Sequence, residues 1–313
     1  MNTIKFAPYN DFVTEQHNVE TATVSNVKVF DKDLLVYNPC NFNVFITNLC
    51  QNRCYFCINA RNDTTHVDDE TYFHNLEKIL QNKGDLHLEA TITGGEPTLA
   101  ASRMVETIRL LKKFGVNERT VSTTGIGLLN KYENKTILQH LIENDYTHNI
   151  SISRMSIDED TNNEVLHGKN ITNETLRKIA FICDTNGVQL RTSTNILAGY
   201  VDNYQKMLDF VDFQHDLGIN SCLFREVIPK LPKNLFSITF LKQAFRNDEN
   251  SVFLKVVDGV FYNIELYMYK SPKTKQEYIV KLYQGKEPGC IGSLSYNQGK
   301  LRIGFNGDIL YGN

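Results

Sequence analysis

The chain has 313 residues, a length that fits one large domain with a small appendage, because barrels of repeated βα units often exceed ~200 residues. Hydrophobic residues make up 41% and charged residues 22%, near the globular averages of roughly 45–50% and ~25%, which excludes disorder, collagen and coiled coil as the main state. The net charge of -3 supplies no field for gripping a phosphate backbone, so nucleic acid is unsupported as a partner.

The N-terminal sequence MNTIKFAPYN lacks the apolar core of a secretory signal, and no run approaches the ~18 apolar residues of a membrane span. We therefore expect a cytoplasmic protein without a membrane partner. In a reducing compartment, clustered cysteines are metal ligands or redox groups more often than disulfides. Of the seven cysteines, four are scattered, whereas Cys50, Cys54 and Cys57 fall close together.

From about residue 44 to 227, short β-rich runs alternate with segments of helical period, which is typical of βα repeats around a parallel sheet. Three of the helical segments end at a glycine followed at once by a strand, at Gly115, Gly187 and Gly218. Six units are too few for a closed eight-fold barrel, so the pattern predicts an α/β fold with an open, partial (β/α)6 TIM-like barrel. The predicted strands are Val44–Thr47, Glu89–Thr93, Thr120–Thr124, Asn149–Ser153, Gln189–Thr194 and Ser221–Arg225.

The pattern changes on either side of this core. Residues 1–40 are β-rich in part but carry no readable motif, and we treat them as an N-terminal extension. Residues 41–230 form the predicted barrel. Residues 231–313 contain two hairpin signals, Asp258-Gly259 and Asn306-Gly307, between β-rich runs, which predicts a small α+β C-terminal cap over the barrel mouth.

The cysteine triplet begins at the end of the first predicted strand, where βα barrels build their active sites. Three thiolates can hold three corners of an iron–sulfur cube and leave one iron open for a ligand. The alternative from spacing alone is a zinc-stabilised binding module, with His66 or His74 as the fourth ligand.

Two motifs on consecutive strands resemble the radical S-adenosylmethionine (SAM) superfamily. The first is Cys50-x3-Cys54-x-Phe56-Cys57, and the second is Gly94-Gly95-Glu96-Pro97 after the next strand. The resemblance implies a [4Fe-4S] cluster on the three cysteines. It also implies reductive cleavage of SAM to a 5′-deoxyadenosyl radical that abstracts a hydrogen atom from the substrate.

The resemblance also suggests SAM contacts. Phe56 would lie against the adenine, Gly94 and Gly95 would let the backbone approach SAM, and carbonyls beside Glu96 would accept from its ammonium, on a turn stiffened by Pro97. We therefore expect Gly95→Val to block SAM while sparing the cluster.

Later strands end in small polar residues, where related enzymes contact the ribose and carboxylate of SAM. The candidates are Thr124, Ser153, Ser193 and Asn195. Arg154 is a candidate for holding a carboxylate of SAM or substrate, although an arginine at a strand end is often paired with a neighbouring acid.

The order of elements resembles relatives of the molybdenum-cofactor GTP cyclase, with a degenerate cap of SPASM/Twitch type. Cys290 has no close cysteine neighbour, so no auxiliary cluster is expected. The first interpretation is hydrogen abstraction from a small polar metabolite, a nucleotide, sugar or amino acid, leading to rearrangement, cyclisation, epimerisation or oxidation. The alternative is modification of a peptide substrate. An electron donor such as flavodoxin or ferredoxin is implied, and residues 287–313 are expected to act as a lid.

Overall fold

The computed structural model describes residues 23–59, 66–116, 118–143, 146–219, 221–227, 238–258, 261–286, 289–304 and 307–312. Among them, no helix is long and apolar enough to cross a membrane. The first half of the described chain comprises β1 (Thr23–Val29), β2 (Lys32–Phe45), α2 (Asp69–Gln81), β3 (Leu88–Thr93), η3 (Pro97–Ala100), α3 (Ala101–Lys113), β4 (Glu118–Thr123), β5 (Lys131–Tyr132), β6 (Lys135–Thr136), α4 (Ile137–Ile142) and β7 (Asn149–Ser153). The second half comprises α5 (Glu159–Leu166), α6 (Asn173–Thr185), β8 (Gln189–Asn195), α7 (Tyr204–Asp216), β9 (Ser221–Arg225), α8 (Thr239–Asn247), β10 (Ser251–Asp258), β11 (Tyr262–Lys270), β12 (Glu277–Gly285), β13 (Ile291–Asn297), β14 (Lys300–Ile303) and β15 (Ile309–Tyr311).

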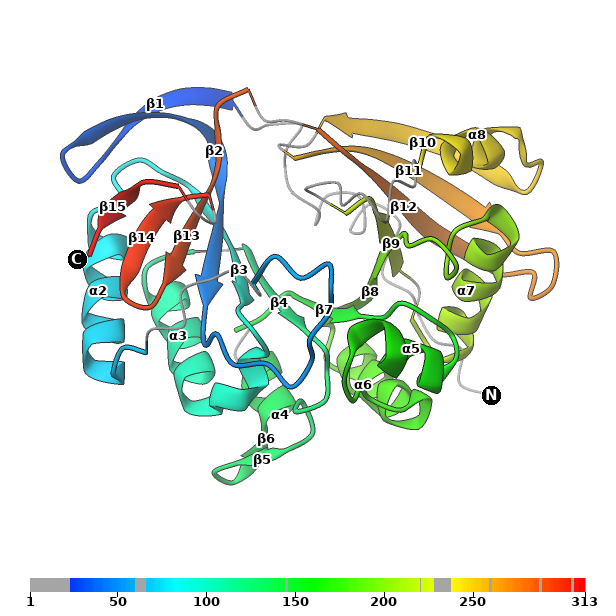
Figure 1. The fold of residues 1–313 in the computed structure, drawn as a ribbon, viewed down its shortest axis with the longest axis horizontal. Coiled ribbons are helices and arrows are strands. Elements are labelled where there is room, and N and C mark those ends of the chain that lie inside the picture. The colour runs from blue at the N-terminus through cyan, green and yellow to red at the C-terminus, as the bar shows by residue number, and fades with distance from the viewer. Residues whose placement is uncertain are drawn as a thin grey trace.

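One curved sheet organises the molecule (Figure 1). Its central strands run parallel in the order β12-β9-β8-β7-β4-β3-β2-β13, with helices between them along the chain. The predicted α/β partial barrel is confirmed, and each of its six predicted strands is present. Two of them, β7 and β9, have the predicted bounds.

The C-terminal region is attached to both edges of this sheet. Strand β12 pairs with β9 and strand β13 pairs with β2, so consecutive strands occupy opposite sides of the barrel (Figure 1). The hairpins β10–β11 and β14–β15 are antiparallel, as the two Gly-containing turns predict, although residues 259–260 and 305–306 lie outside the described residues. Among the described strands the sheet continues past β12 to β10 and past β13 to β15, and these two end strands do not pair, so the sheet stays open.

The N-terminal region is continuous with the barrel. Strands β1 and β2 form an antiparallel hairpin, and β2 runs without a break through residue 40, where the sequence suggested a boundary. Before the predicted start at Val44, β2 contains Asp33, Pro39 and three Asn residues, types that are depleted in strands, and this explains why the sequence does not indicate its early start.

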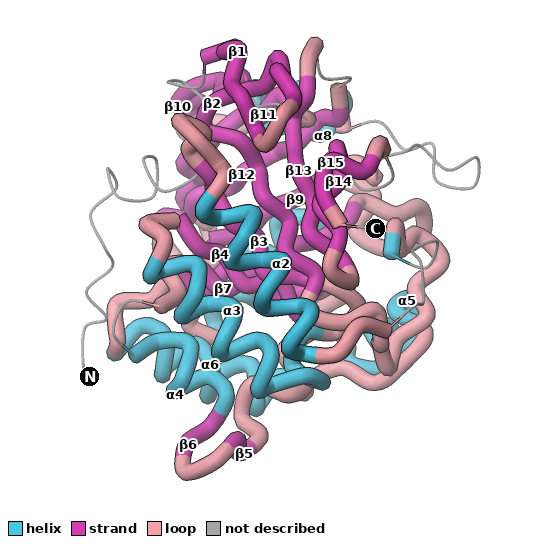
Figure 2. The backbone as a smooth tube through the Cα atoms, turned by 90° about the vertical axis from the view of Figure 1, so that its left-hand side faces the viewer, coloured by secondary structure: helices cyan, strands magenta, loops and turns pink. Residues whose placement is uncertain are grey.

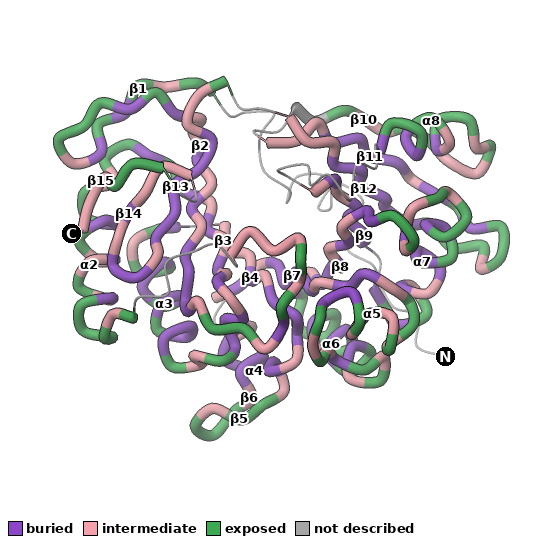
Figure 3. Tube along the Cα trace, viewed as in Figure 1, coloured by how far each residue is buried: buried purple, intermediate pink, exposed green. Residues whose placement is uncertain are grey.

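The two faces of the sheet differ in polarity, because successive strand residues point to opposite faces. The outer face carries apolar residues such as Val44, Ile92 and Ile150, which pack against the helices that cover the strands on one side in Figure 2. Figure 3 shows buried residues along the central strands and on the helices that cover them. The inner face, here called the lumen, has one polar residue from each of six strands in register, namely Ser295, Asn43, Thr91, Thr120, Asn149 and Gln189.

A closed TIM barrel fills its interior with branched apolar side chains. Here the corresponding positions carry hydroxyl and amide groups, several of which are only half-buried. This part of the lumen is therefore suited to polar ligands, whereas near β9 and β12 a small apolar cluster that includes Leu223 and Tyr283 also faces inward.

Candidate active site

The three clustered cysteines lie in one loop, residues 46–59, which follows β2 and is here called the cysteine loop. Cys50 is exposed, whereas Cys54 and Cys57 are half-buried. None of the three forms a disulfide, and all remain available as thiolate ligands.

One side of the cysteine loop is docked on the turn after β3, residues 94–97. The Gly95 N–H donates to the Thr47 carbonyl and the Glu96 N–H donates to the Leu49 carbonyl, both at 2.7 Å. The side-chain amide of Asn59 donates to the carbonyl of Gly94. The two loops therefore form one unit held by main-chain hydrogen bonds.

The two glycines of this turn are required by that docking. A Cβ at Gly95 would lie 2.0 Å from the Leu49 carbonyl oxygen, and one at Gly94 would lie 2.3 Å from that of Thr47. Gly94 also has a φ of +142°, which side chains rarely adopt. The expectation that Gly95→Val would spare the cluster is therefore wrong, since the added side chain would strike the cysteine loop itself.

The other side of the cysteine loop is docked on the C-terminal end of α5. The Arg53 N–H lies 3.2 Å from both the Leu166 and His167 carbonyl oxygens, and the Cys54 thiol lies 3.3 Å from the former. Gly168 packs under the loop, because a Cβ there would lie 2.1 Å from Asn52 Oδ1. The sequence motifs do not indicate α5, Gly168 or Asn59. Of these, only Gly168 carries a local signal, because a glycine often follows the end of a helix.

The Glu96 carboxylate joins the turn after β3 to the end of β4. It is fully buried and accepts from the Thr98 N–H and hydroxyl, the Thr123 hydroxyl, and the Thr124 N–H and hydroxyl, at 2.5–3.2 Å. Gln51 of the cysteine loop donates to the Thr124 hydroxyl at 2.9 Å. The side chain of Thr124, predicted to contact SAM, therefore serves this internal network instead. Pro97 begins η3, which Glu96 caps.

In the cysteine loop, burial and the neighbouring thiols raise the pKa of Cys50 and that of Cys54. Burial, followed by the nearby Cys57 and Cys50, raises the pKa of Cys54 to about 12. Burial also raises the pKa of Cys50, with Glu96 and Cys57 acting in the same direction, against the Asn52 N–H that lowers it. A positively charged metal centre is what such a group of thiols needs to deprotonate.

This donor set fits an iron–sulfur cube, in which each cysteine binds a different iron. Within the described ranges, no three Cys, His, Asp or Glu side chains are gathered as ligands of a single metal ion.

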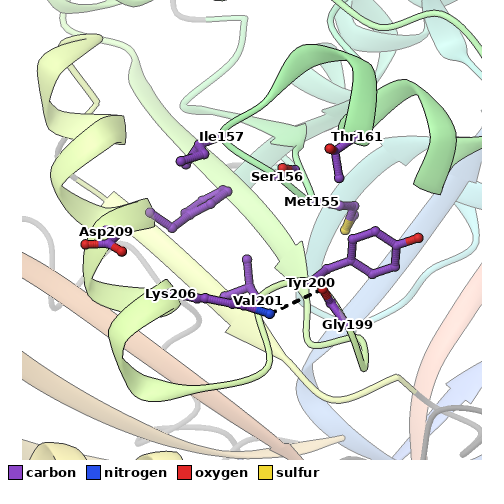
Figure 4. Close-up of a pocket in the computed structure, with 10 residues that line it drawn as sticks. Met155, Ser156, Ile157, Thr161, Gly199, Tyr200, Val201, Lys206 and Asp209 are labelled. Carbon is purple, nitrogen blue, oxygen red and sulfur yellow. Dashed lines mark hydrogen bonds between the residues drawn. The ribbon is translucent and has the colours of Figure 1, made fainter.

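Phe56 belongs to an apolar cluster beside the cysteine loop. It packs with Cys54 and Tyr200 against Met155, Val165, Leu166 and Leu197. Met155 and Tyr200 also line a pocket of about 190 Å³ between the segments that follow β7 and β8 (Figure 4). Lys206 closes one side of it, donating to the Gly199 carbonyl at 3.2 Å.

Three of the predicted polar contacts lie together at the carboxyl ends of β7 and β8. Ser153 and Ser193 are in register on these neighbouring strands, and Asn195 is in register with Arg225 of β9. All three predicted residues are half-buried on the lumen side.

Arg154 does not lie with them, and its predicted role is wrong. Its side chain is fully buried, and its guanidinium donates to the carbonyls of Ser156, Ile171 and Ile157 at 2.8–3.2 Å and to the Asn173 side chain. The strand alternation turns it away from the lumen, so it stabilises the segment after β7 and cannot reach a SAM or substrate carboxylate.

Comparison with known proteins identifies the class. The family model of the radical SAM superfamily matches residues 44–213, more than half of the chain, and the chain belongs to this superfamily. No curated protein matches it significantly.

Solved structures share the fold. SuiB of Streptococcus suis bound to S-adenosylmethionine has 17% sequence identity and a TM-score of 0.50 over 66% of this chain and 46% of SuiB. SuiB bound to the precursor peptide SuiA has 18% identity and a TM-score of 0.51 over 67% of this chain and 45% of SuiB. The enzyme anSMEcpe with bound AdoMet and a Cp18Cys peptide has 16% identity and a TM-score of 0.49 over 66% and 58% of the two chains. The chain thus spans less than half the length of SuiB.

Membership of the superfamily makes the protein an enzyme that uses a [4Fe-4S] cluster and SAM, and it excludes the zinc-binding alternative. When bound, the cluster supplies the electron that cleaves SAM to methionine and a 5′-deoxyadenosyl radical. The contribution of this chain is positional, because its cysteine loop is fixed from two sides and opens on a polar lumen.

Proposed function

We propose that the protein abstracts a hydrogen atom from a peptide substrate and so modifies that peptide. The observation that supports this proposal is the open barrel: among the described strands the sheet ends at β10 on one side and at β15 on the other, and these two strands do not pair, so the sheet does not close around the lumen. An extended chain can enter such an opening without being enclosed at both ends. The precursor peptide bound to SuiB, which shares the fold, favours this interpretation over the small polar metabolite expected from the sequence.

In this proposal Cys50, Cys54 and Cys57 hold the cluster. Phe56 lies against the adenine of SAM, and the main chain of Gly94, Gly95, Glu96 and Pro97, together with Ser153, Ser193 and Asn195, surrounds the rest of SAM. An electron donor such as flavodoxin or ferredoxin, a cytoplasmic location and a degenerate Twitch-like C-terminal region belong to the same proposal. The division into residues 1–40, 41–230 and 231–313 also stays a prediction.

The test uses deuterium as a tracer of the abstracted atom. Cells of the source organism are grown in deuterated medium, and their extract is divided into a peptide fraction and a small-metabolite fraction. Each fraction is added to the anaerobically reconstituted, reduced enzyme with SAM, and deuterium in 5′-deoxyadenosine is measured by mass spectrometry. We expect deuterium transfer from the peptide fraction, lost when that fraction is first digested with protease.

The control is the enzyme in which Cys50, Cys54 and Cys57 are replaced by alanine, which should form no 5′-deoxyadenosine. Deuterium arriving only from the small-metabolite fraction would overturn the peptide proposal while leaving the radical chemistry intact.

A further inference from the structure

Three neighbouring strands, β8, β9 and β12, carry a cationic surface on their lumen face. It consists of Arg191, Arg225 and Lys281, here called the cationic wall. Strand alternation places these residues in the lumen, because the intervening Cys222 and Phe224 pack outward against α7. Arg191 and Lys281 are buried and Arg225 is half-buried. Segments 191–195, 221–225 and 279–283 contain no Asp or Glu.

Arg225 is held in place by aromatic rings. Its guanidinium carbon lies 5.8 Å from the ring centre of Tyr262 and 5.9 Å from that of Tyr283, and the two rings meet edge to face at 5.4 Å. Such contacts orient a guanidinium without neutralising its charge. The Arg225 Nε atom is buried and makes no hydrogen bond within the part of the chain that the structure describes.

The second arginine acts on the same place. Tyr283 is in register with Arg225; burial raises its pKa, whereas the charges of Arg191 and then Arg225 lower it. Asn195 is in register with Arg225 on the neighbouring strand and therefore projects from the same face of the sheet. The three cations therefore lie on successive lumen-facing rows of these neighbouring strands.

The cationic wall lies toward the carboxyl ends of the parallel strands. Arg225 is the last residue of β9, Ser193 and Asn195 end β8, and the turn at residues 94–97 follows the end of β3. Ligands of βα barrels bind at this end of the strands. A partly desolvated guanidinium with a donor atom left over, as in Arg225, favours a ligand that brings negative charge.

We propose that the cationic wall binds an oxyanion of the substrate, a carboxylate or a phosphate, through Arg225 supported by Arg191. The planar guanidinium can donate two parallel hydrogen bonds to such a group. The inference rests on the proposed function, since it assigns this anion to the substrate peptide, on an acidic side chain or a terminal carboxylate.

The test measures binding and does not require turnover. The cluster-loaded enzyme with SAM is titrated anaerobically by calorimetry with N-acetyl-aspartate amide, with its uncharged isostere N-acetyl-asparagine amide, and with inorganic phosphate. We expect the aspartate probe to bind roughly 10-fold or more tightly than the asparagine probe, because hydrogen bonds to charged groups are the stronger ones. Arg225→Gln should abolish that preference, and Arg225→Lys should retain part of it.

The matched control is Arg109→Gln, which removes the same charge from an exposed site on α3, outside the lumen. It should keep the preference of the natural enzyme. Iron content and circular dichroism show whether each variant is folded, and the comparison of the probes on the natural enzyme needs no variant at all.

Equal binding of the two amino-acid probes, or no binding of the aspartate probe and phosphate, would overturn the inference. So would a loss of SAM affinity in Arg225→Gln without a change in probe preference, because the wall would then belong to SAM. Phosphate binding more tightly than the aspartate probe would support the wall and assign it to a phosphorylated substrate. None of these results depends on the deuterium-transfer test, so the two proposals can fail separately.

Discussion

At the scale of single residues, the turn after β3 and the cysteine loop meet most closely at Gly95, where an added Cβ would lie 2.0 Å from the Leu49 carbonyl oxygen. The three cysteines stand in one loop as their spacing predicts, because the loop is local in sequence. For Thr124 the sequence does not indicate the true partner, Glu96, which is distant in sequence, and for Arg154 it does not show that the segment after β7 folds back around the guanidinium. The motif predicts Gly95 as a SAM contact, whereas the structure shows the main chain of Leu49 as its close neighbour.

A substitution at Gly95 can distinguish whether this residue is needed for packing against the cysteine loop or for contact with SAM. Gly95→Ala should destabilise the cysteine loop by about 1–3 kcal/mol or more, as overpacking does, and should lower the iron content of the reconstituted protein. Gly289→Ala is the control, since its nearest neighbour, the Tyr37 hydroxyl, is 3.9 Å from the added Cβ. A Gly95→Ala protein with full iron content and weakened SAM binding would restore the original interpretation.

At the scale of elements, the βα periodicity predicts which segments form strands and helices, but not how loops are joined to one another. The ends of β3 and β4 are joined by the buried Glu96 carboxylate, and the cysteine loop is joined to α5 by main-chain bonds. The motif predicts that Glu96 belongs to a SAM-binding turn. Its neighbouring sequence does not indicate the threonines that donate hydrogen bonds to its carboxylate.

Replacing Glu96 tests this joint between the elements. In the natural protein, hydroxyl and N–H donors point at both carboxylate oxygens of Glu96. In Glu96→Gln one of these oxygens is replaced by an NH2 group, which cannot accept, so at least one buried hydrogen bond is lost. We expect a loss of about 1–3 kcal/mol in the free energy of unfolding, measured with denaturant on the metal-free protein. Glu106→Gln, on the exposed face of α3, should change it little. Equal effects of the two substitutions would show that the carboxylate does not join the elements.

At the scale of the whole molecule, the open barrel follows from counting βα units, whereas the placement of β12 and β13 does not. Their parallel partners, β9 and β2, are distant in sequence, and hairpin signals indicate local pairing only. The expected lid at residues 287–313 therefore takes a different form. Strand β13 belongs to the central sheet, and Leu294, Tyr296 and Leu301 are buried in the main core.

Deleting residues 290–313 should accordingly destroy the fold, and not merely uncouple SAM cleavage from substrate turnover as a lid deletion would. It removes three large core side chains, each worth roughly 2–5 kcal/mol when truncated, against a total stability of only about 5–15 kcal/mol for a typical protein. The Tyr296 ring also packs on Tyr72 of α2 at 4.9 Å, so the loss reaches the helix layer. Deleting residues 305–313 leaves β13 and β14 in place, and this shorter deletion should keep both a cooperative thermal transition and the capacity to bind iron. If the longer deletion also kept both, β13 would be dispensable to the fold, and the segment would be a lid after all.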